Sequence, residues 1–258
     1  MALVLHARAF RDNYIWVIPD PAGRAAIVID PGDEQPVRAA LAAHGLTLAA
    51  IFCTHHHSDH SGGIPALARD TGIPVYGPAR EAVPGVTHPV SEGDEIRVAG
   101  FPERFRVLDI PGHTAGHIAY FDDERLFSGD TLFSAGCGRV FEGTPALLFQ
   151  SLEKLAALPE DLEVYCGHEY TLKNLEFALT IEPHNPVLVD YYRNVRRLRE
   201  RNEPSLPSSL RIERQINPFL RVRETRVREA VANRTGRKSD TPAAIFATLR
   251  RWKDDFKG

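Results

Sequence analysis

Short apolar runs, each closed by a turn sequence, fill the first two thirds of the chain. Residues 14–18 and 25–29 form two such runs, and Asp20-Pro21-Ala22-Gly23 lies between them as a turn sequence. Runs of this length that are rich in branched and aromatic residues predict β-strands. The same pattern predicts further strands at residues 50–53, 106–110, 117–121, 125–127 and 163–166.

Apolar residues at helical spacing predict the helices. Val37, Ala40 and Leu41 have this spacing, and helices are also predicted at residues 64–68 and 145–155. After residue 170 the strand pattern gives way to helices at residues 172–179, 186–201, 225–233 and 241–256. The last of these carries one apolar stripe, formed by Ile245, Leu249, Trp252 and Phe256. The pattern therefore predicts an α+β fold in which helices cover sheets, followed by a smaller all-helical region.

Charge divides the chain at the same place. Residues 1–170 hold 12 Lys+Arg against 23 Asp+Glu, net −11, whereas residues 171–258 hold 19 against 11, net +8. A shift of this size predicts two domains, 1–170 and 171–258, with different tasks. The whole chain of 258 residues carries a net charge of −3, which argues against a general nucleic-acid binder. Its 43% hydrophobic and 25% charged residues exclude a disordered or fibrous protein.

The sequence contains no segment that predicts export or membrane insertion. The apolar start is too short for a signal peptide, and no run approaches the ~18 apolar residues of a membrane span. Three Cys residues are too few for a disulfide scaffold. We therefore expect a cytoplasmic monomer without a membrane or nucleic-acid partner. The motifs that bind nicotinamide cofactors or ATP, and the serine-hydrolase motif, are also absent from the sequence.

The strongest chemical motif is Thr54-His55-His56-His57-Ser58-Asp59-His60, which directly follows a predicted strand. Imidazoles and carboxylates are common ligands of zinc and similar divalent ions. Residues two apart in an extended segment point the same way, so His55 and His57 can reach one ion. Asp59 and His60 come where the chain turns toward a helix and can reach a second ion. His56, between two candidate ligands, is predicted to point away from them.

Three more candidate ligands follow other predicted strands, each directly after a glycine. They are His113, Asp130 and His168. Each is a weak indication alone, but together with the first motif they supply two three-ligand sets and a bridging carboxylate. Asp30, also at a strand end, is predicted either to hold a ligand histidine or to cap a helix. His117 is predicted to lie in the core or beside a ligand.

These motifs, in this order, resemble the metallo-β-lactamase fold, and more closely the glyoxalase II (hydroxyacylglutathione hydrolase) family. The resemblance extends to Asp12-Asn13-Tyr14-Ile15-Trp16, to residues 136–143, to Cys166-Gly167-His168-Glu169-Tyr170-Thr171 and to Arg250-Arg251-Trp252-Lys253-Asp254. It spans essentially the whole chain. It implies an αββα sandwich followed by a helical substrate-binding domain.

The resemblance also implies a role for each site residue. It assigns His55, His57 and His113 to one metal, Asp59, His60 and His168 to a second, and Asp130 to a bridge. It assigns substrate contacts to Arg139, Phe141, Tyr170, Arg250 and Lys253. Some members of that family carry Lys and Tyr where this chain has Arg139 and Phe141. Phe141 has no hydroxyl group, so its contact is expected to be apolar or through its backbone.

The implied reaction is hydrolysis of S-D-lactoylglutathione, and of related 2-hydroxyacyl thioesters, to glutathione and D-lactate. Two divalent ions would lower the pKa of a shared water from ~15.7 toward ~7. Asp59 is expected to orient the resulting hydroxide. Zinc is the first choice for the ions, and iron and manganese fit the same His and Asp ligands. Arg250 and Lys253, three apart on a helix, are expected to bind the glycine carboxylate of the glutathione thioester.

Several alternatives use the same residues. A class B β-lactamase shares the His-rich motif but often has Cys at the position of Asp130, and a persulfide dioxygenase uses a single iron. A nuclease would use the +8 region, and a metal-binding scaffold would show broken ligand sets, whereas all seven positions are filled here. A nucleophilic Cys53, Cys137 or Cys166 is a further alternative, although Cys inside strands is commonly buried and inert.

Overall fold

The computed structural model describes residues 4–69, 71–237 and 241–257. The chain forms two compact units. The first consists of Met1–Asp109 and Thr114–Gly129, and the second of Ile110–His113 and Asp130–Gly258. The short segment that ends at His113 therefore belongs to the second unit, although the residues on both sides of it belong to the first.

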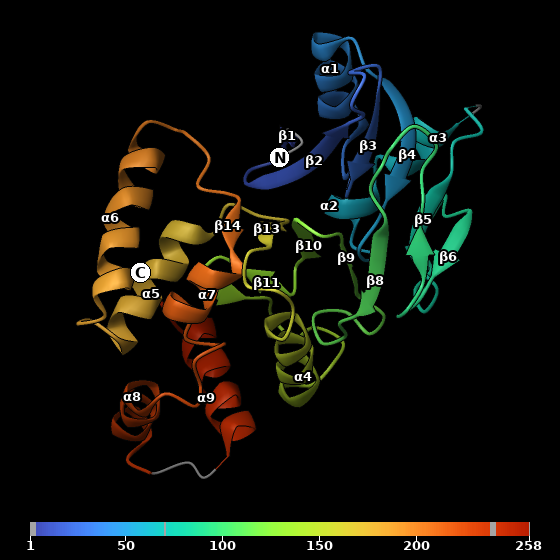
Figure 1. Ribbon diagram of the computed structural model, residues 1–258. Coiled ribbons are helices and arrows are strands. Elements are labelled where there is room, and N and C mark those ends of the chain that lie inside the picture. The colour runs from blue at the N-terminus through green and yellow to red at the C-terminus, as the bar shows by residue number, and fades with distance from the viewer. Residues whose placement is uncertain (1–3, 70, 238–240, 258) are drawn as a thin grey trace. The chain divides into compact units, whose positions relative to one another are not determined.

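A mixed six-stranded sheet forms one layer of the first unit (Figure 1). Its strands, in spatial and chain order, are β1 (Leu5–Ala9), β2 (Asn13–Pro19), β3 (Ala25–Ile29), β4 (Thr47–Phe52), β5 (Val75–Pro78) and β6 (His88–Val90). Strands β1 to β3 are antiparallel neighbours, and β3 to β6 are parallel neighbours. Because residues 14–18 are all apolar, β2 is buried on both faces, as expected for a strand covered on two sides.

Four further strands of the first unit form an antiparallel ladder in chain order. They are β7 (Glu95–Ile96), β8 (Phe105–Asp109), β9 (Ile118–Phe121) and β10 (Arg125–Gly129). Aromatic side chains join this ladder to the first sheet. The ring centroid of Phe52 lies 5.1 Å from that of Phe105 and 4.8 Å from that of Tyr120. The two layers therefore pack face to face as a sandwich.

Three helices complete the first unit: α1 (Glu34–His44), α2 (Ser58–Ser61) and α3 (Ile64–Ala68). Helix α1 begins after Asp33, whose carboxylate accepts a hydrogen bond from the backbone N–H of Gln35, and it ends at Gly45, where φ is 65°. Val37 and Leu41 bury the apolar face of α1 in one cluster with residues of the first sheet. The prediction that helices cover a sheet is thus confirmed for this layer.

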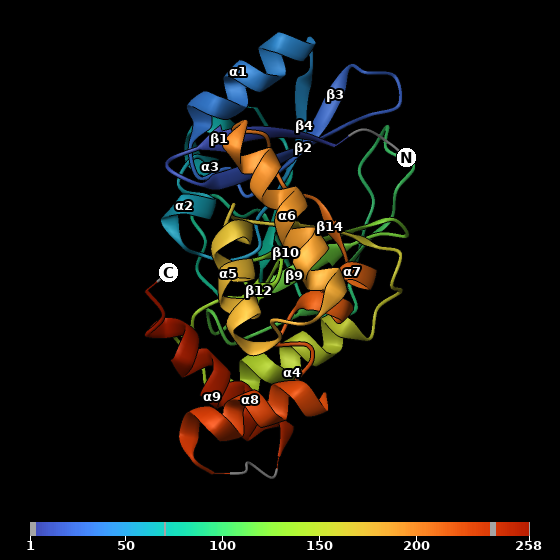
Figure 2. The ribbon, with the colours of Figure 1, turned by 90° about the vertical axis from the view of Figure 1, so that its left-hand side faces the viewer.

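The second unit is mainly helical, and Figure 2 shows its helices most clearly. They are α4 (Pro145–Ala156), α5 (Thr171–Ile181), α6 (Pro186–Glu200), α7 (Leu210–Ile216), α8 (Thr225–Thr235) and α9 (Pro242–Asp254). Two antiparallel pairs of short strands accompany them: β11 (Leu132–Phe133) with β12 (Gly136–Cys137), and β13 (Glu163–Cys166) with β14 (Ser208–Ser209). Helix α5 packs against α6 and α8, and α9 packs against α4 and α8.

The predicted apolar stripe anchors α9. Ile245 and Leu249 are buried, while the rings of Trp252 and Phe256 lie 5.6 Å and 5.4 Å from the ring of Phe177 in α5. Burying side chains of this size contributes about 1.5–3 kcal/mol each relative to exposing them, which fixes the rotation of α9 about its axis. Among the residues described, no helix is both long and apolar enough to cross a membrane.

Candidate metal centre

The loop after β4 brings two imidazole nitrogens to one point. Nε2 of His55 and Nδ1 of His57 lie 3.1 Å apart. Two nitrogens bound to one tetrahedral zinc ion at ~2.1 Å would lie about 3.4 Å apart, so this pair is close to a ligating geometry. The other ring nitrogen of His55, Nδ1, lies 3.0 Å from the hydroxyl of Thr54, and this contact orients the ring. The spacing argument for these two residues is supported within the first unit.

Asp59 and His60 form a second pair, on α2. The carboxylate atom Oδ2 of Asp59 lies 3.6 Å from Nε2 of His60. Asn13, at the start of β2, donates its side-chain amide to the same carboxylate oxygen at 3.0 Å. Nothing in the local pattern around Asn13 indicated this contact, because Asn13 and Asp59 are 46 residues apart. The glycine at position 32 has no room for a side chain, since a Cβ there would overlap the backbone carbonyl of Asp59.

Asp30 orients His60. Its Oδ2 lies 3.0 Å from Nδ1 of His60 and accepts a hydrogen bond from the Thr54 hydroxyl at 2.8 Å, and its Oδ1 accepts from the Thr54 backbone N–H at 2.7 Å. A carboxylate in this place keeps the proton of His60 on Nδ1, so Nε2 is the nitrogen with a lone pair for a metal. Of the two roles predicted for Asp30, the structure supports the contact with a histidine, because Asp33 is the cap of α1.

In the second unit, one carboxylate lies between two imidazoles. Oδ2 of Asp130 is 3.5 Å from Nε2 of His113 and 3.2 Å from Nε2 of His168. All three side chains are buried. A carboxylate placed between two histidines in this way has the geometry of a ligand that two ions share. The backbone carbonyl of Arg139 accepts a hydrogen bond from Nδ1 of His113 at 2.9 Å, so Nε2 of that ring is the nitrogen that faces Asp130.

The other two histidines of the predicted segments lie beside the proposed ligands, and a ring nitrogen of His56 lies within 4.8 Å of one of His57 rather than pointing away from it. His56 is partly exposed, and its backbone N–H donates to Oε2 of Glu81 at 2.8 Å. Glu81 also accepts from the backbone N–H of Gly116 at 2.7 Å, so it links two loops, which the sequence did not indicate. His117 is fully buried and stacks on His55 with 4.5 Å between the ring centroids. The prediction for His117 is confirmed.

The cysteines are poor nucleophiles. All three are buried and form no disulfide. Burial raises the pKa of the Cys137 thiol to about 11 and that of Cys166 to about 12, and it raises the pKa of Cys53 well above its usual range. Only the thiolate attacks a carbonyl carbon, so these residues supply almost no nucleophile at neutral pH.

The five predicted substrate contacts all lie in the second unit and differ in exposure. The side chains of Arg139 and Phe141 are 68% and 62% exposed. Tyr170 stacks on the ligand candidate His168, with ring centroids 4.7 Å apart. The ammonium group of Lys253 donates to the backbone carbonyl of Lys173 at 3.1 Å. Arg250 is buried, and its guanidinium bonds to protein groups.

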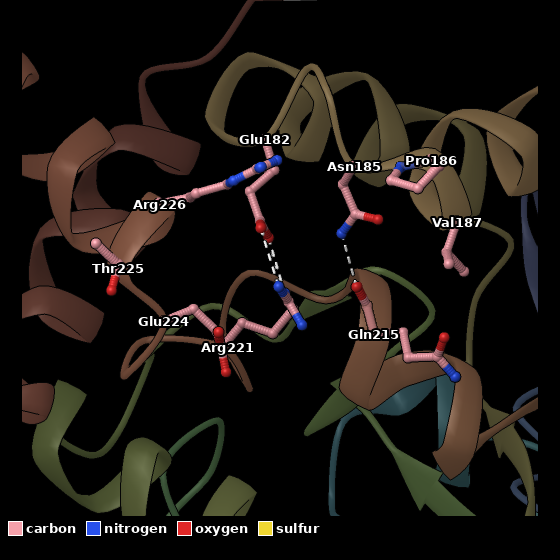
Figure 3. A pocket seen from close by; sticks show the side chains of 9 residues that line it. All are labelled: Glu182, Asn185, Pro186, Val187, Gln215, Arg221, Glu224, Thr225 and Arg226. Carbon is pink, nitrogen blue, oxygen red and sulfur yellow. Dashed lines mark hydrogen bonds and ion pairs between the residues drawn. The ribbon is translucent and has the colours of Figure 1, made fainter.

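A pocket of about 410 Å³ in the second unit contains none of the predicted site residues. It lies between the start of α6, the end of α7 and the start of α8 (Figure 3). Glu182 accepts two hydrogen bonds from Arg221 at 2.8 Å and 2.9 Å across its wall, and Asn185 donates to the carbonyl of Gln215 at 2.9 Å. Its polar lining is thus largely occupied by internal bonds, and the chemistry of the chain lies elsewhere.

The donor sets of both units suit a borderline divalent cation. The first unit offers three imidazole nitrogens and the Asp59 carboxylate, and the second offers two imidazole nitrogens and the Asp130 carboxylate. Nitrogen and oxygen donors of this kind bind zinc, iron or manganese, while calcium and magnesium prefer oxygen alone. The predicted ligands therefore fit divalent metals, and no predicted position is replaced by a residue that cannot ligate.

Comparison with known proteins identifies the class. Residues 9–168 match the model of the metallo-beta-lactamase superfamily, and residues 169–256 match that of the hydroxyacylglutathione hydrolase C-terminus. The sandwich with histidines and aspartates after its strands is thus that of a metallo-beta-lactamase protein, which confirms the expected α+β fold.

The chain is 54% identical over 254 residues to the hydroxyacylglutathione hydrolase of Alkalilimnicola ehrlichii, covering 98% of this chain and 99% of that protein. It is 49% identical over 258 residues to that of Nitrosomonas europaea, covering 100% and 98%. The chain belongs to the hydroxyacylglutathione hydrolase family, as the sequence motifs indicated.

Two solved structures resemble this chain in fold. The crystal structure of ETHE1 from Myxococcus xanthus aligns with a TM-score of 0.66 and 28% identity, covering 97% of this chain and 98% of that one. The crystal structure of TTHA1623 in a di-iron-bound form aligns with a TM-score of 0.52 and 30% identity, over 64% of this chain and 91% of that one. The second similarity shows that a related sandwich holds two metal ions.

Proposed function

We propose that this chain hydrolyses S-D-lactoylglutathione and related S-2-hydroxyacylglutathiones to glutathione and D-lactate or another 2-hydroxy acid. This reaction is the second step of methylglyoxal detoxification. The observation that carries the proposal is that every metal-ligand candidate is present and oriented within its own unit, in a chain 54% identical over 98% of its length to a hydroxyacylglutathione hydrolase. The domain limits 1–170 and 171–258 are part of the proposal.

The proposed centre holds two ions, with zinc as the first choice. His55, His57 and His113 would hold one ion, Asp59, His60 and His168 would hold the other, and Asp130 would be shared. Two ions, when bound, lower the pKa of a shared water toward neutrality and stabilise negative charge on the substrate oxygen.

Asp59 is proposed to orient the attacking water and to accept its proton. Asn13 donates to Oδ2 of Asp59, which helps to orient this carboxylate. The leaving group is the sulfur atom of glutathione. Thiols have a pKa near ~8.5, so this atom departs as a thiolate with little need for a proton donor. No buried acid of this chain is required for that step.

Arg139, Phe141, Tyr170 and Lys253 are proposed to contact the substrate. Both Arg139 and Phe141 are exposed and so accessible to a ligand, although Arg139 lies 3.9 Å from the carboxylate of Asp254 and the ring of Phe141 lies 5.2 Å from that of His113. Lys253 is proposed to bind the glycine carboxylate of the thioester. The contact between Arg250 and the same carboxylate remains a prediction, since the guanidinium of Arg250 is engaged within the protein.

The affinity for glutathione thioesters is expected to fall as the pH rises through 8. Burial, and then the nearby Arg250 charge, lower the pKa of Lys253 to about 8. A depressed pKa means that the ammonium form is present below about pH 8 and is lost above it. A charge-assisted hydrogen bond contributes roughly 1.5–3 kcal/mol, and about 3% of the ammonium form remains at pH 9.5, so KM should rise about 8-fold to ~25-fold between pH 7 and pH 9.5. Steady-state kinetics across this range provide the measurement.

The control for this pH dependence is Lys253→Arg, whose guanidinium keeps its charge throughout the range. Its KM should stay level while that of the unchanged chain rises. A small thioester without glutathione should show no such rise in either protein. Equal pH profiles for Lys253→Arg and the unchanged chain would remove Lys253 from the recognition of the carboxylate.

The activity itself is tested by incubating the metal-replete protein with S-D-lactoylglutathione and following the release of free thiol. Metal content per chain is measured on the same sample. We expect hydrolysis, two ions per chain, loss of activity on chelation and recovery when a divalent ion is added back. One of the alternative activities would be supported if the thioester stayed intact and another reaction occurred. That reaction would be hydrolysis of a β-lactam, oxygen consumption with glutathione persulfide, or cleavage of RNA.

A cytoplasmic location and a monomeric state complete the proposal. The three cysteines form no disulfide, which is typical of proteins in a reducing compartment. Light scattering coupled to size-exclusion chromatography measures the oligomeric state directly.

A further inference from the structure

We propose that Arg250 is a positioning residue for the ligand His113, and that it acts through the backbone of residues 137–139. The inference rests on the proposed function only in taking His113 as a metal ligand. It assigns the C-terminal helix α9 a role in metal binding in addition to any role in substrate recognition.

Both Nη atoms of Arg250 are hydrogen-bonded inside the protein, while its buried Nε has no hydrogen-bond partner among the described residues. The side chain is 5% exposed, and its Nη1 donates to the backbone carbonyl of Cys137 at 2.8 Å and to that of Gly138 at 3.3 Å. Nη2 donates to Asp254 at 2.9 Å, and the guanidinium lies over the ring of Phe219. A buried charge with these partners is costly to move, because leaving the site would strand the two carbonyls without a donor.

Residues 137–139, which Arg250 holds, contact two metal-ligand candidates, Asp130 and His113. The backbone N–H of Gly138 donates to the carbonyl of Thr131 at 3.1 Å, and a Cβ at Gly138 would overlap the carbonyl of Asp130. The next carbonyl, that of Arg139, accepts from Nδ1 of His113 at 2.9 Å. A carbonyl can only accept, so this bond fixes the proton on Nδ1 and presents the lone pair of Nε2.

The β11–β12 hairpin, which leads into residues 137–139, is held by Glu213 of α7 and by Asn217 directly after that helix. Glu213 is buried and accepts from the Ser134 hydroxyl at 2.8 Å and from the Ala135 N–H at 2.7 Å. Asn217 donates to the carbonyls of Phe133 and Gly136 at 3.1 Å and 3.0 Å. The β11–β12 hairpin thus has several restraints, whereas the exit from it at residues 137–139 is held by Arg250 and by the bond from the Gly138 N–H to Thr131. Removing the guanidinium should loosen the position of the Arg139 carbonyl while the hairpin stays in place.

Two variants and one matched control test this role. Arg250→Met keeps the length and apolar stem of the side chain but has no donor, and Arg250→Lys keeps one charged donor. The control is Arg251→Ala, the next residue of α9, which is exposed and reaches only the hydroxyl of Thr248. For each protein, zinc affinity of the metal-free chain is measured by competition with a chromophoric chelator. Circular dichroism of the metal-free chains reports whether they fold.

We expect Arg250→Met to weaken the binding of zinc about 10–100-fold, the range typical for partners that orient a ligand histidine. Arg250→Lys should lie between Arg250→Met and the unchanged chain, and Arg251→Ala should match the unchanged chain. The value of kcat should fall for S-D-lactoylglutathione and for a small thioester alike, when both are measured at a fixed, subsaturating zinc concentration. If Arg250→Met does not fold, Arg250→Lys carries the test, together with the NMR signal of the His113 Nδ1 proton. That signal should be sharp in the unchanged chain and broadened in Arg250→Lys.

Either of two results would overturn the proposal. One is a zinc affinity of the folded Arg250 variants within twofold of that of the unchanged chain. The other is an unaltered His113 proton signal in Arg250→Lys. A raised KM confined to the glutathione thioester would then identify Arg250 as a substrate contact. Failure of the proposed function is a separate result: the unchanged chain would not hydrolyse the thioester, while the difference in zinc affinity between Arg250→Met and Arg251→Ala would remain.

Discussion

Replacing Asp130 with alanine is expected to lower kcat by at least about a hundredfold and to leave fewer than two ions per chain. Oδ2 of this carboxylate lies 3.2 Å from His168 and 3.5 Å from His113, so its removal takes a negative charge from between two imidazoles. Loss of a partner that merely orients a ligand costs about 10–100-fold, and loss of a shared ligand should cost no less. Metal analysis and steady-state kinetics on the same sample provide the measurement.

The control for Asp130→Ala is Asp161→Ala, in the same unit, where the side chain is 81% exposed and pairs with Arg211. This control should retain full metal content and activity. If Asp130→Ala kept more than about a tenth of kcat with two ions bound, Asp130 would not be a shared ligand. A variant that unfolds is recognised from its circular dichroism, and Asp130→Asn then takes its place.

Asp30→Asn is expected to weaken the binding of one ion by about 10–100-fold. The variant keeps one oxygen for the Thr54 N–H but presents an amide N–H₂ to Nδ1 of His60. That nitrogen would then have to accept a hydrogen bond, which moves the proton of His60 to Nε2 and removes the lone pair that would bind a metal. Asparagine also tolerates the backbone at this position, where φ is 53°, so the change isolates the hydrogen bond. Titration of the metal-free protein with zinc measures the effect.

Asp33→Asn is the matched control, three residues along the chain. Asp33 caps α1, and asparagine caps a helix equally well, so its zinc titration should match that of the unchanged chain. If Asp30→Asn bound both zinc ions as tightly as the unchanged chain, the carboxylate of Asp30 would not set the tautomer of His60.

The sequence predicted the longer elements because their pattern is local. Apolar residues stand at the spacing of their own secondary structure in strands β2, β3 and β13 and in helices α4 and α9. The sequence missed strands β1, β5 and β6 and the two-residue strands β7, β11, β12 and β14, since pairing with a neighbour defines them and no local period does. Helix α7 was missed for a related reason: it is only seven residues long.

The site divides in the same way. The pairs His55 with His57 and Asp59 with His60 follow from spacing within one motif, and the structure places each pair together. The contact of Asn13 with Asp59, and that of Arg250 with Cys137, join residues 46 and 113 positions apart. Such contacts depend on how sheets and helices pack, so no window of the sequence contains them. The resemblance to a family indicated that Arg250 matters, but the buried guanidinium could be seen only in the fold.

Two glycines set a limit for anyone who wishes to redesign this enzyme. The backbone at Gly32 presses against the carbonyl of Asp59, and the backbone at Gly138 presses against that of Asp130. In a saturation library of the chain, these positions should be depleted of every other amino acid, although neither glycine touches a ligand atom. A screen for new thioester substrates gains most by sparing both codons and randomising exposed positions such as Phe141.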